Sequence, residues 1–117
     1  MEATIKLTKT MLDKSIIDAN KSVREFLDRD FGMSYDDPFF TEGCKLTISG
    51  EYLDGKRYDI RFYRTGKRKD KRISIQKIKL YADVGDTVVL TSDAEGVGDA
   101  TQIYINVVRE TDYRRSA

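Results

Sequence analysis

The stretch CKLTISGEYLDGKRYDIRFYR, residues 44–64, decides the fold class. In its first half Leu46 and Ile48 alternate with polar residues, and apolar residues recur at the same spacing from Tyr58 to Phe62. A period of two places alternate side chains on opposite faces of a strand. Asp54-Gly55, between the two halves, is the signal of a tight hairpin turn. This stretch therefore predicts a β-hairpin with one apolar face.

Other parts of the chain carry short apolar patterns of the same kind, separated by residues that favour turns. Val84-Gly85-Asp86 is one such turn. Many short strands joined by turns are typical of a β-barrel or a β-sandwich. We therefore predict a mostly β domain of six or seven strands, a barrel with a helix covering one opening. Besides the hairpin, the predicted strands are Ala3–Leu7, Ser15–Ala19, Thr87–Leu90 and Ile103–Val108, and Ile73–Leu80 is predicted to be a further strand or a strand followed by a turn.

One segment has helical periodicity, because its apolar residues recur three and four positions apart. The helix is expected to start at Asn20 or at Lys21–Ser22, since Ser22 is a good cap and Glu25 follows it at the spacing of a capping box. Gly32 predicts the end of this helix, since glycine readily adopts the left-handed conformation that terminates helices. We expect the helix over Val23–Asp30.

The remaining segments set the organisation of the chain. Thr8–Lys14 is polar and is predicted to be a loop, and a second short helix is expected within Met33–Thr41 or Ile75–Ala82. The last residues are polar, and such ends commonly fray. We therefore expect one domain over 1–110 and a frayed tail over 111–117.

Composition excludes several classes of function. The chain has 117 residues, which suits one domain, and no His, which excludes Ser-His-Asp triads and histidine metal sites. Cys44 is the only cysteine, which excludes an internal disulfide and suits a reducing, cytoplasmic setting. We expect Cys44 to be a small buried hydrophobe at the start of a strand. No apolar run is long enough to span a membrane, so no membrane partner is expected.

The charges are unevenly distributed along the chain. Lysine and arginine number 21 against 20 acidic residues, a net charge of +1, yet nine basic residues lie from Arg61 to Lys79 with Asp70 as the only acid. The densest part, Arg64–Arg72, lies between two predicted strands and should form a projecting loop. Because the other acids gather elsewhere, we expect a surface with one positive face, which would attract a polyanion such as nucleic acid.

The charge pattern alone does not single out nucleic acid as the partner. Basic hairpin tips also act as solvated edges that prevent strand pairing, and they also bind acidic proteins or lipids. The acidic groups have simpler interpretations: Asp36-Asp37 is a loop turn rather than a metal or acid–base pair. The cluster Asp93, Glu95 and Asp99 lacks EF-hand spacing and is interpreted as a solvated loop. We therefore expect no catalytic group, no cofactor and no metal.

Four pieces of the chain follow one another in an informative order. They are a strand, polar loop, strand and helix over Ile5–Phe31, the hairpin Lys45–Tyr63, the basic segment Gly66–Ile73, and Ala82–Leu90 with the closing strand Ile103–Val108. In this order they resemble the B3-like DNA-binding domain. That family includes plant transcription-factor domains and the recognition domains of some bacterial restriction endonucleases and McrB-type restriction proteins. The resemblance covers most of the chain.

The resemblance implies an open, seven-stranded pseudobarrel with one or two short helices and with double-stranded DNA as its partner. In that family two arms grip the major groove. By position, the first arm is Thr8–Lys14, with Lys9, Thr10 and Lys14 as the contacting residues. The second arm is Arg64–Arg72, and either Arg68 or Arg72 is the expected base contact. The residues expected to bind DNA from this second arm are Arg64, Lys67, Arg68, Lys69, Lys71 and Arg72.

Two further residues and the wider role follow from the same resemblance. Asn20 and Lys21 precede the helix and are expected to contact a phosphate. The implied role is a non-catalytic, sequence-specific recognition domain of a restriction system, with a nuclease or motor in another domain or subunit. A protein-interaction domain with an acidic partner and a PUA-like RNA-binding barrel remain as alternatives that use the same basic loop.

Overall fold

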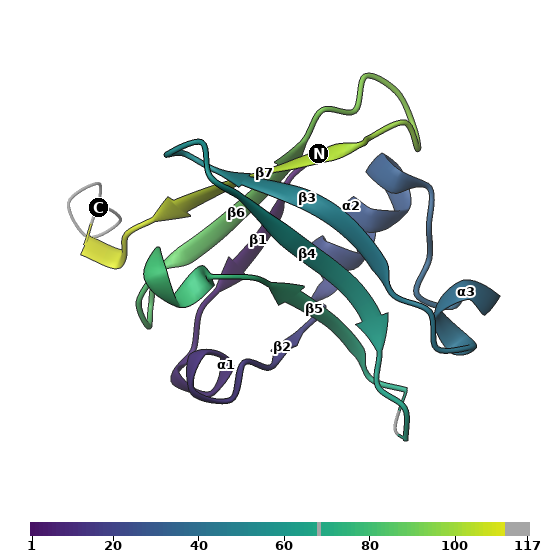
Figure 1. Ribbon diagram of the computed structural model, residues 1–117, viewed down its shortest axis with the longest axis horizontal. Helices are drawn as coiled ribbons and strands as arrows, with labels where there is room; N and C mark the ends of the chain where they lie inside the picture. The colour runs from purple at the N-terminus through teal and green to yellow at the C-terminus, as the bar shows by residue number, and fades with distance from the viewer. Residues whose placement is uncertain (68, 112–117) are drawn as a thin grey trace.

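One seven-stranded sheet organises the structure, a computed structural model that describes residues 1–67 and 69–111 (Figure 1). The order across the sheet is β1-β6-β7-β3-β4-β5-β2, and every neighbouring pair is antiparallel except β3 and β7. The curved sheet forms an open pseudobarrel, which confirms the predicted fold class. The strands are β1 (Ala3–Lys6), β2 (Ile17–Asp18), β3 (Leu46–Tyr52), β4 (Arg57–Arg64), β5 (Lys71–Ile75), β6 (Thr87–Ser92) and β7 (Gln102–Val108).

The predicted hairpin is present as β3 and β4. Its register pairs Ile48 with Ile60, so the alternating apolar residues of the two strands share the inner face. Gly55 has a φ of +86° in the turn between them, a conformation that glycine adopts without steric cost. Gly50 is buried, and a Cβ there would lie 2.7 Å from the Ile60 side chain. Side chains from the inner face therefore fill the space directly over Gly50.

Side chains at the N-terminus of α2 (Lys21–Phe31) contact β1, one of the two edge strands of the sheet. The Thr4 N–H donates a hydrogen bond of 3.0 Å to Ser22 Oγ, and Asn20 Nδ2 donates one of 2.9 Å to the Thr4 carbonyl oxygen. An unpaired strand edge is prone to pair with another chain. Asn20 and Ser22 therefore cover the backbone of Thr4 at this edge of the open barrel.

The helices are α1 (Lys9–Lys14), α2 (Lys21–Phe31), α3 (Pro38–Thr41) and the 3-10 helix η1 (Ile78–Leu80). The prediction of a polar loop over Thr8–Lys14 is wrong, because α1 occupies it. Thr8 Oγ1 accepts a hydrogen bond of 3.3 Å from the Met11 N–H and caps the helix. No residue of α1 is buried, so the helix has no apolar stripe by which periodicity would reveal it. The two short helices α3 and η1 fall inside the two segments expected for one. Over Ile73–Leu80 the strand ends at Ile75 and a turn follows, which is one of the two alternatives expected for this segment.

The beginning of α2 agrees with the expected start at Asn20, but Ser22 does not act as its cap. Asn20, and not Ser22, caps the helix, since Asn20 Oδ1 accepts a hydrogen bond of 3.0 Å from the Val23 N–H. The Ser22 hydroxyl instead forms hydrogen bonds with the backbone of Thr4 in β1. The helix ends as predicted, at Gly32 with a φ of +67°.

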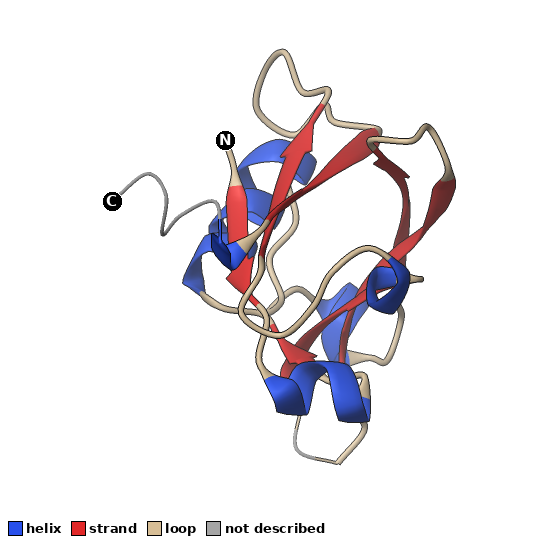
Figure 2. Cartoon of the chain, turned by 90° about the vertical axis from the view of Figure 1, so that its left-hand side faces the viewer, coloured by secondary structure: helices blue, strands red, loops and turns tan. Residues whose placement is uncertain are grey.

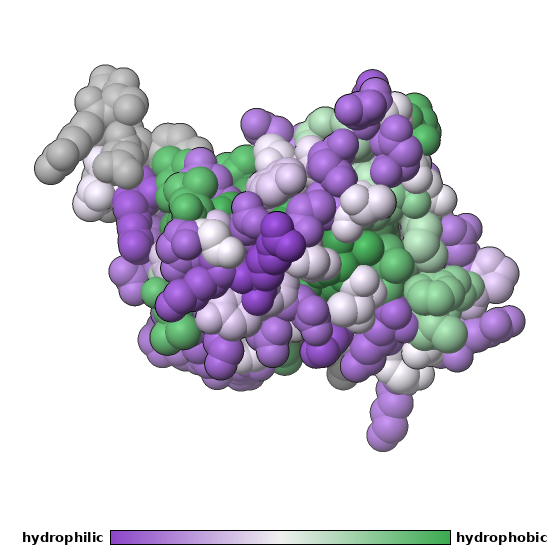
Figure 3. Space-filling model, turned by 45° about the horizontal axis from the view of Figure 1, so that its top comes forward, coloured by the Kyte–Doolittle hydropathy of each residue, from purple (hydrophilic) through white to green (hydrophobic). Residues whose placement is uncertain are grey.

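The core lies between the concave face of the sheet and α2. Phe26 and Leu27 of α2 are fully buried, together with Ile60 and Phe62 of β4 and Ile5 of β1. The surface seen in Figure 3 is largely hydrophilic, with apolar residues gathered in patches between the polar ones. Within the described residues, no helix is long and apolar enough to cross a membrane. The frayed tail predicted over 111–117 falls outside the described residues, apart from Thr111.

Candidate nucleic-acid interface

The two segments expected to form arms lie at the same end of the molecule. The α1 segment (Thr8–Ser15) connects β1 to β2, and the hairpin tip (residues 65–70) connects β4 to β5. Both lie at the lower end of the molecule in Figures 1 and 2, with β2 between them in Figure 1. β2 pairs with β5 through Ile17 and Asp18. The sheet edge formed by β2 and β5 therefore positions both segments.

The hairpin tip is a closed turn held from inside. The Asp70 carbonyl oxygen accepts a hydrogen bond of 3.0 Å from the Thr65 N–H, and Thr65 Oγ1 accepts one of 2.9 Å from the Asp70 N–H. Arg64 Nε donates a hydrogen bond of 2.7 Å to the Lys69 carbonyl oxygen. The backbone of the tip is therefore set by contacts at its base.

The two arginines at the base of the tip, Arg64 and Arg72, point into the fold. Arg64 Nη1 donates hydrogen bonds to the Tyr35 carbonyl oxygen (3.2 Å) and to Asp36 Oδ1 (3.3 Å). Arg72 Nε lies 2.8 Å from Asp18 Oδ1, and its Nη2 donates a hydrogen bond of 3.1 Å to an oxygen of Asp70. Each arginine side chain is only 16% exposed. In this arrangement both guanidinium groups hold the tip in place.

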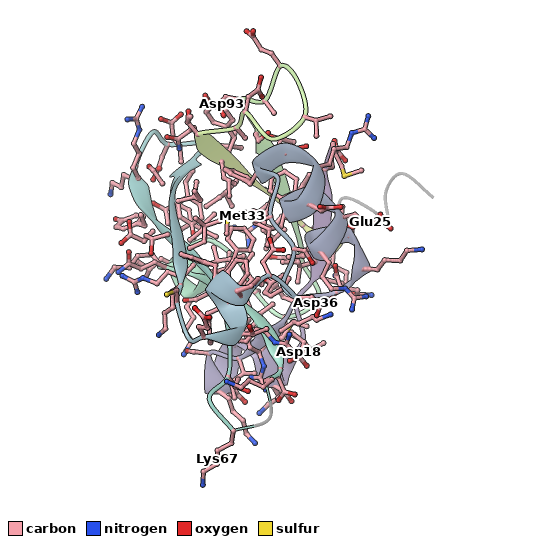
Figure 4. All side chains as sticks on the ribbon, turned by 90° about the vertical axis from the view of Figure 1, so that its right-hand side faces the viewer. Asp18, Glu25, Met33, Asp36, Lys67 and Asp93 are labelled. Atoms are coloured by element: carbon pink, nitrogen blue, oxygen red, sulfur yellow. The ribbon has the colours of Figure 1, made fainter. Side chains whose placement is uncertain are left out.

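The lysine side chains of the hairpin differ in whether they contact other residues. Lys71 Nζ lies 3.6 Å from Asp36 Oδ1, and Lys69 Nζ donates a hydrogen bond of 3.2 Å to the Thr41 carbonyl oxygen. Lys67 is exposed, has no ion pair to any other described residue, and points away from the body in Figure 4. Arg68 lies outside the described residues. Lys67 is therefore the cation of the described tip that is most available to a ligand.

Acidic side chains lie within the face that the sequence predicts to be positive. Asp18 and Asp36 come from distant segments and pair with basic residues of the β4–β5 hairpin, as Asp70 does within it. Figure 4 shows Asp18 and Asp36 close to the body, above the projecting Lys67. The positive charge at this end is therefore partly neutralised, and its exposed part lies toward the tip.

The α1 segment contributes one cation that pairs with no acid in the described part of the chain. Lys9 Nζ lies 2.7 Å from Asp13 Oδ2 one turn along the helix. Thr10 and Lys14 are exposed, and Lys14 has no ion pair to any residue that the structure describes. The C-terminal turn of α1 therefore presents an exposed lysine at the same end of the molecule as the tip.

The two residues predicted to meet phosphate before α2 have contacts within the fold. Asn20 uses both ends of its amide, since Oδ1 caps α2 and Nδ2 holds Thr4. Lys21 Nζ lies 3.7 Å from Glu25 Oε1, and both side chains are largely exposed. The structure thus gives Asn20 a role in capping α2 and attaching its N-terminus to β1.

Backbone strain occurs in the α1 segment, in the hairpin tip and at the opposite end of β5 from the tip, independently of charge. Among the described residues, three that are not glycine have a positive φ: Ser15 (+54°), Lys69 (+56°) and Lys77 (+66°). A left-handed conformation costs such residues roughly 1–2 kcal/mol. Residues held in this way cluster at functional sites. Ser15 ends α1, Lys69 lies in the tip, and Lys77 begins η1.

Ser15 and Lys77 line one groove. It has a volume of about 340 Å³ and separates α1 from the end of β5 and η1. Apolar side chains of both walls, such as Met11 and Ile75, line it, and Lys77 and Lys79 stand on the η1 wall. Both lysines belong to the basic run seen in the sequence but were not predicted as site residues. Only the structure brings them beside α1.

The acidic residues considered for metal or acid–base chemistry stabilise turns. Asp37 Oδ2 accepts a hydrogen bond of 2.9 Å from the Ser34 N–H. Asp93 accepts hydrogen bonds from the Thr101 hydroxyl and N–H and from the Gln102 N–H, which hold the pKa of its carboxyl below the ordinary value. Over 1–67 and 69–111, no group of three or more His, Cys, Asp or Glu is placed to hold a metal ion.

The prediction that Cys44 is buried is wrong. Cys44 is exposed, and β3 begins two residues later, at Leu46. The Cys44 N–H donates a hydrogen bond of 3.0 Å to the Phe39 carbonyl oxygen, so the residue belongs to the turn that follows α3. Alternation with Leu46 and Ile48 suggested an inward side chain, but the strand pattern does not extend back to Cys44.

Comparison with protein-family models finds no match to this chain. A search of curated proteins also finds no match. The geometry and charge of this end of the molecule are therefore the basis on which a function can be inferred.

Proposed function

We propose that this chain is a B3-like recognition domain that binds double-stranded DNA through the α1 segment and the hairpin tip. The observation that carries the proposal is their position, since two basic segments far apart in sequence flank the same sheet edge. A pair of projecting basic segments suits a duplex, because its phosphates lie along both sides of each groove. The strained backbone at Ser15 and Lys69 supports the same location.

The residues have different parts in this proposal. Lys14 and Lys67 are exposed and supply phosphate contacts, whereas Arg64 and Arg72 position the tip. Base contacts then come from the tip, and Arg68, which follows Lys67 in the sequence and lies outside the described residues, has a side chain that can bind guanine through two hydrogen bonds. The domain contributes recognition, and a nuclease or motor in another domain or subunit of a restriction system would supply the chemistry.

A competition experiment tests this function. Labelled random duplex DNA is bound to the protein at two salt concentrations and challenged with single-stranded DNA of the same sequence or with duplex RNA. The proposal predicts a preference for duplex DNA, affinity that falls steeply with salt, and enrichment of a short motif after selection. Preference for RNA would favour a PUA-like barrel. Absence of binding at low salt would leave an acidic protein as the partner of the tip.

A charge-reversal pair locates the interface. Lys67→Glu, in the tip, should weaken DNA binding at least about tenfold, because it removes one phosphate contact and repels the next. Lys56→Glu is the matched control, because Lys56 is an exposed lysine in the turn at the opposite end of β4. Equal losses in the two variants would mean that binding follows net charge alone and would refute the assigned site.

A further inference from the structure

The groove between α1 and η1 carries positive charge that no described residue neutralises through an ion pair. Lys77 and Lys79 are exposed and line it, and neither forms an ion pair with any residue in 1–67 or 69–111. By contrast, Lys71 at the other end of β5 pairs with Asp36, and Arg72 pairs with Asp18. Two such lysines on one wall of a groove point to an anionic ligand.

The backbone of the groove is held in a conformation that its residues disfavour. Lys77 and Ser15 both have positive φ, and they face the groove from opposite walls. Lys77 precedes η1 without capping it through its side chain, so its identity is not explained by the helix that it begins. Glycine would fit this position with less strain, which indicates that the lysine side chain itself is used.

The two groups of lysines are separated by a strand that is longer than the width of one DNA groove. Lys67 precedes β5 and Lys77 follows it, and β5 has five residues. At about 3.3 Å per residue that strand is roughly 17 Å long. The major groove of B-DNA is about 12 Å wide and has a phosphate strand along each side. A protein with cations at both ends of β5 can therefore meet both strands that border one groove.

We propose that the groove between α1 and η1 holds the second phosphate strand of a bound duplex, with Lys77 and Lys79 as its contacts. This inference rests on the proposed function and extends the interface along the whole of β5. The apolar side chains of the groove, among them Met11, would lie against the sugars, whose edges are less polar than the phosphates.

The test measures how the affinity of the protein for a random duplex depends on salt. Each phosphate contact contributes about −0.9 to the slope of log K against log [salt]. The double variant Lys77→Gln, Lys79→Gln should therefore reduce the magnitude of the slope by about 1.8, and should weaken binding to all duplexes by the same factor. The single variant Lys56→Gln should leave both slope and affinity unchanged. Circular dichroism and urea unfolding of each variant check that the fold is retained.

Three outcomes are distinguishable. The inference is supported if the slope of the double variant falls while that of Lys56→Gln does not. It is overturned on its own if the wild-type protein binds duplex DNA, Lys67→Glu weakens binding, and the double variant keeps the wild-type slope. A groove that takes an apolar small molecule would give this second result. If the wild-type protein does not bind duplex DNA at all, both the proposed function and this inference are refuted.

Discussion

Arg64 Nε donates a hydrogen bond of 2.7 Å to the Lys69 carbonyl oxygen, so a largely buried guanidinium closes the hairpin tip from inside. Lys69 has a φ of +56°, and this contact helps to hold its backbone there. The same guanidinium reaches the Tyr35 carbonyl oxygen and Asp36, and so ties the tip to the loop before α3. Arg64 therefore fixes both the shape of the tip and its direction.

Arg64→Lys should lower the free energy of unfolding by about 1.5 kcal/mol, because lysine keeps the charge but cannot make the forked set of hydrogen bonds. If the tip binds DNA, affinity should fall as well, although the net charge is the same. Urea unfolding and DNA titration measure the two effects.

Arg61→Lys is the control for Arg64→Lys. Arg61 lies on the same strand but is exposed, and its contact with Asp59 is a surface ion pair. Such pairs contribute about 0–1 kcal/mol. If Arg64→Lys lowers the free energy of unfolding no more than Arg61→Lys does, Arg64 does not fix the tip.

Local pattern was sufficient to predict most of the fold. The hairpin of β3 and β4 follows from period-two alternation and one Asp-Gly turn, and the end of α2 follows from Gly32. The pattern could not predict α1, which lies on the surface and has no buried residue. It left the helix start open between Asn20 and Lys21–Ser22 and could not exclude Ser22 as the cap, because the partner of the Ser22 hydroxyl is Thr4, eighteen residues away in β1.

The candidate site was predictable only in outline. The density of lysine and arginine located the tip, but the pairing of Arg64 with Asp36 and of Arg72 with Asp18 depends on tertiary contacts. From the sequence alone, an exposed basic residue of the run cannot be distinguished from one that pairs with an acidic residue of another segment. The groove beside Lys77 could not be predicted either, because its other wall is α1, which only the tertiary structure brings close to Lys77.

Lys77→Gly should raise the free energy of unfolding by about 0.5–1 kcal/mol. A left-handed lysine costs roughly 1–2 kcal/mol, and the greater freedom of glycine in the unfolded chain offsets part of the gain. Lys79→Gly is the matched control, because it places glycine inside η1 and should be destabilising by about 0.5–1 kcal/mol. Urea midpoints compare the two. If Lys77→Gly lowers the free energy of unfolding, the contacts of the lysine side chain stabilise the fold by more than its left-handed backbone costs.

Asn20→Ala should lower the free energy of unfolding by about 2 kcal/mol, since it removes the cap of α2 and the hydrogen bond that attaches the start of α2 to Thr4 of β1. Asn20→Asp keeps an oxygen for the Val23 N–H but loses the donor to Thr4, so its effect should be intermediate. Lys21→Ala, at an exposed position, should change stability by less than about 0.5 kcal/mol. If the Asp and Ala variants are equally destabilised, the helix cap is not a separate contribution.

Asp86 should make the fold sensitive to acid. Burial alone would raise the pKa of its carboxyl, but hydrogen bonds from the Asp83 and Glu110 N–H groups and from Arg109 outweigh burial and hold that pKa below the ordinary value. A carboxyl with a lowered folded pKa stabilises the fold above its unfolded pKa of about 3.9, and that stability is lost as the pH falls through the folded value.

Asp86→Asn should therefore lower the free energy of unfolding at pH 7 by about 1–3 kcal/mol, because a buried site loses a charged acceptor. The variant should also lose less stability than the wild-type protein as the pH falls from about 5 to about 2, the range in which carboxyl groups titrate. Asp13→Asn, at an exposed position of α1, is the control and should follow the wild-type pH curve closely. Urea unfolding at several pH values measures these curves. Parallel curves for Asp86→Asn and the wild-type protein would show that the protonation of Asp86 does not control acid unfolding.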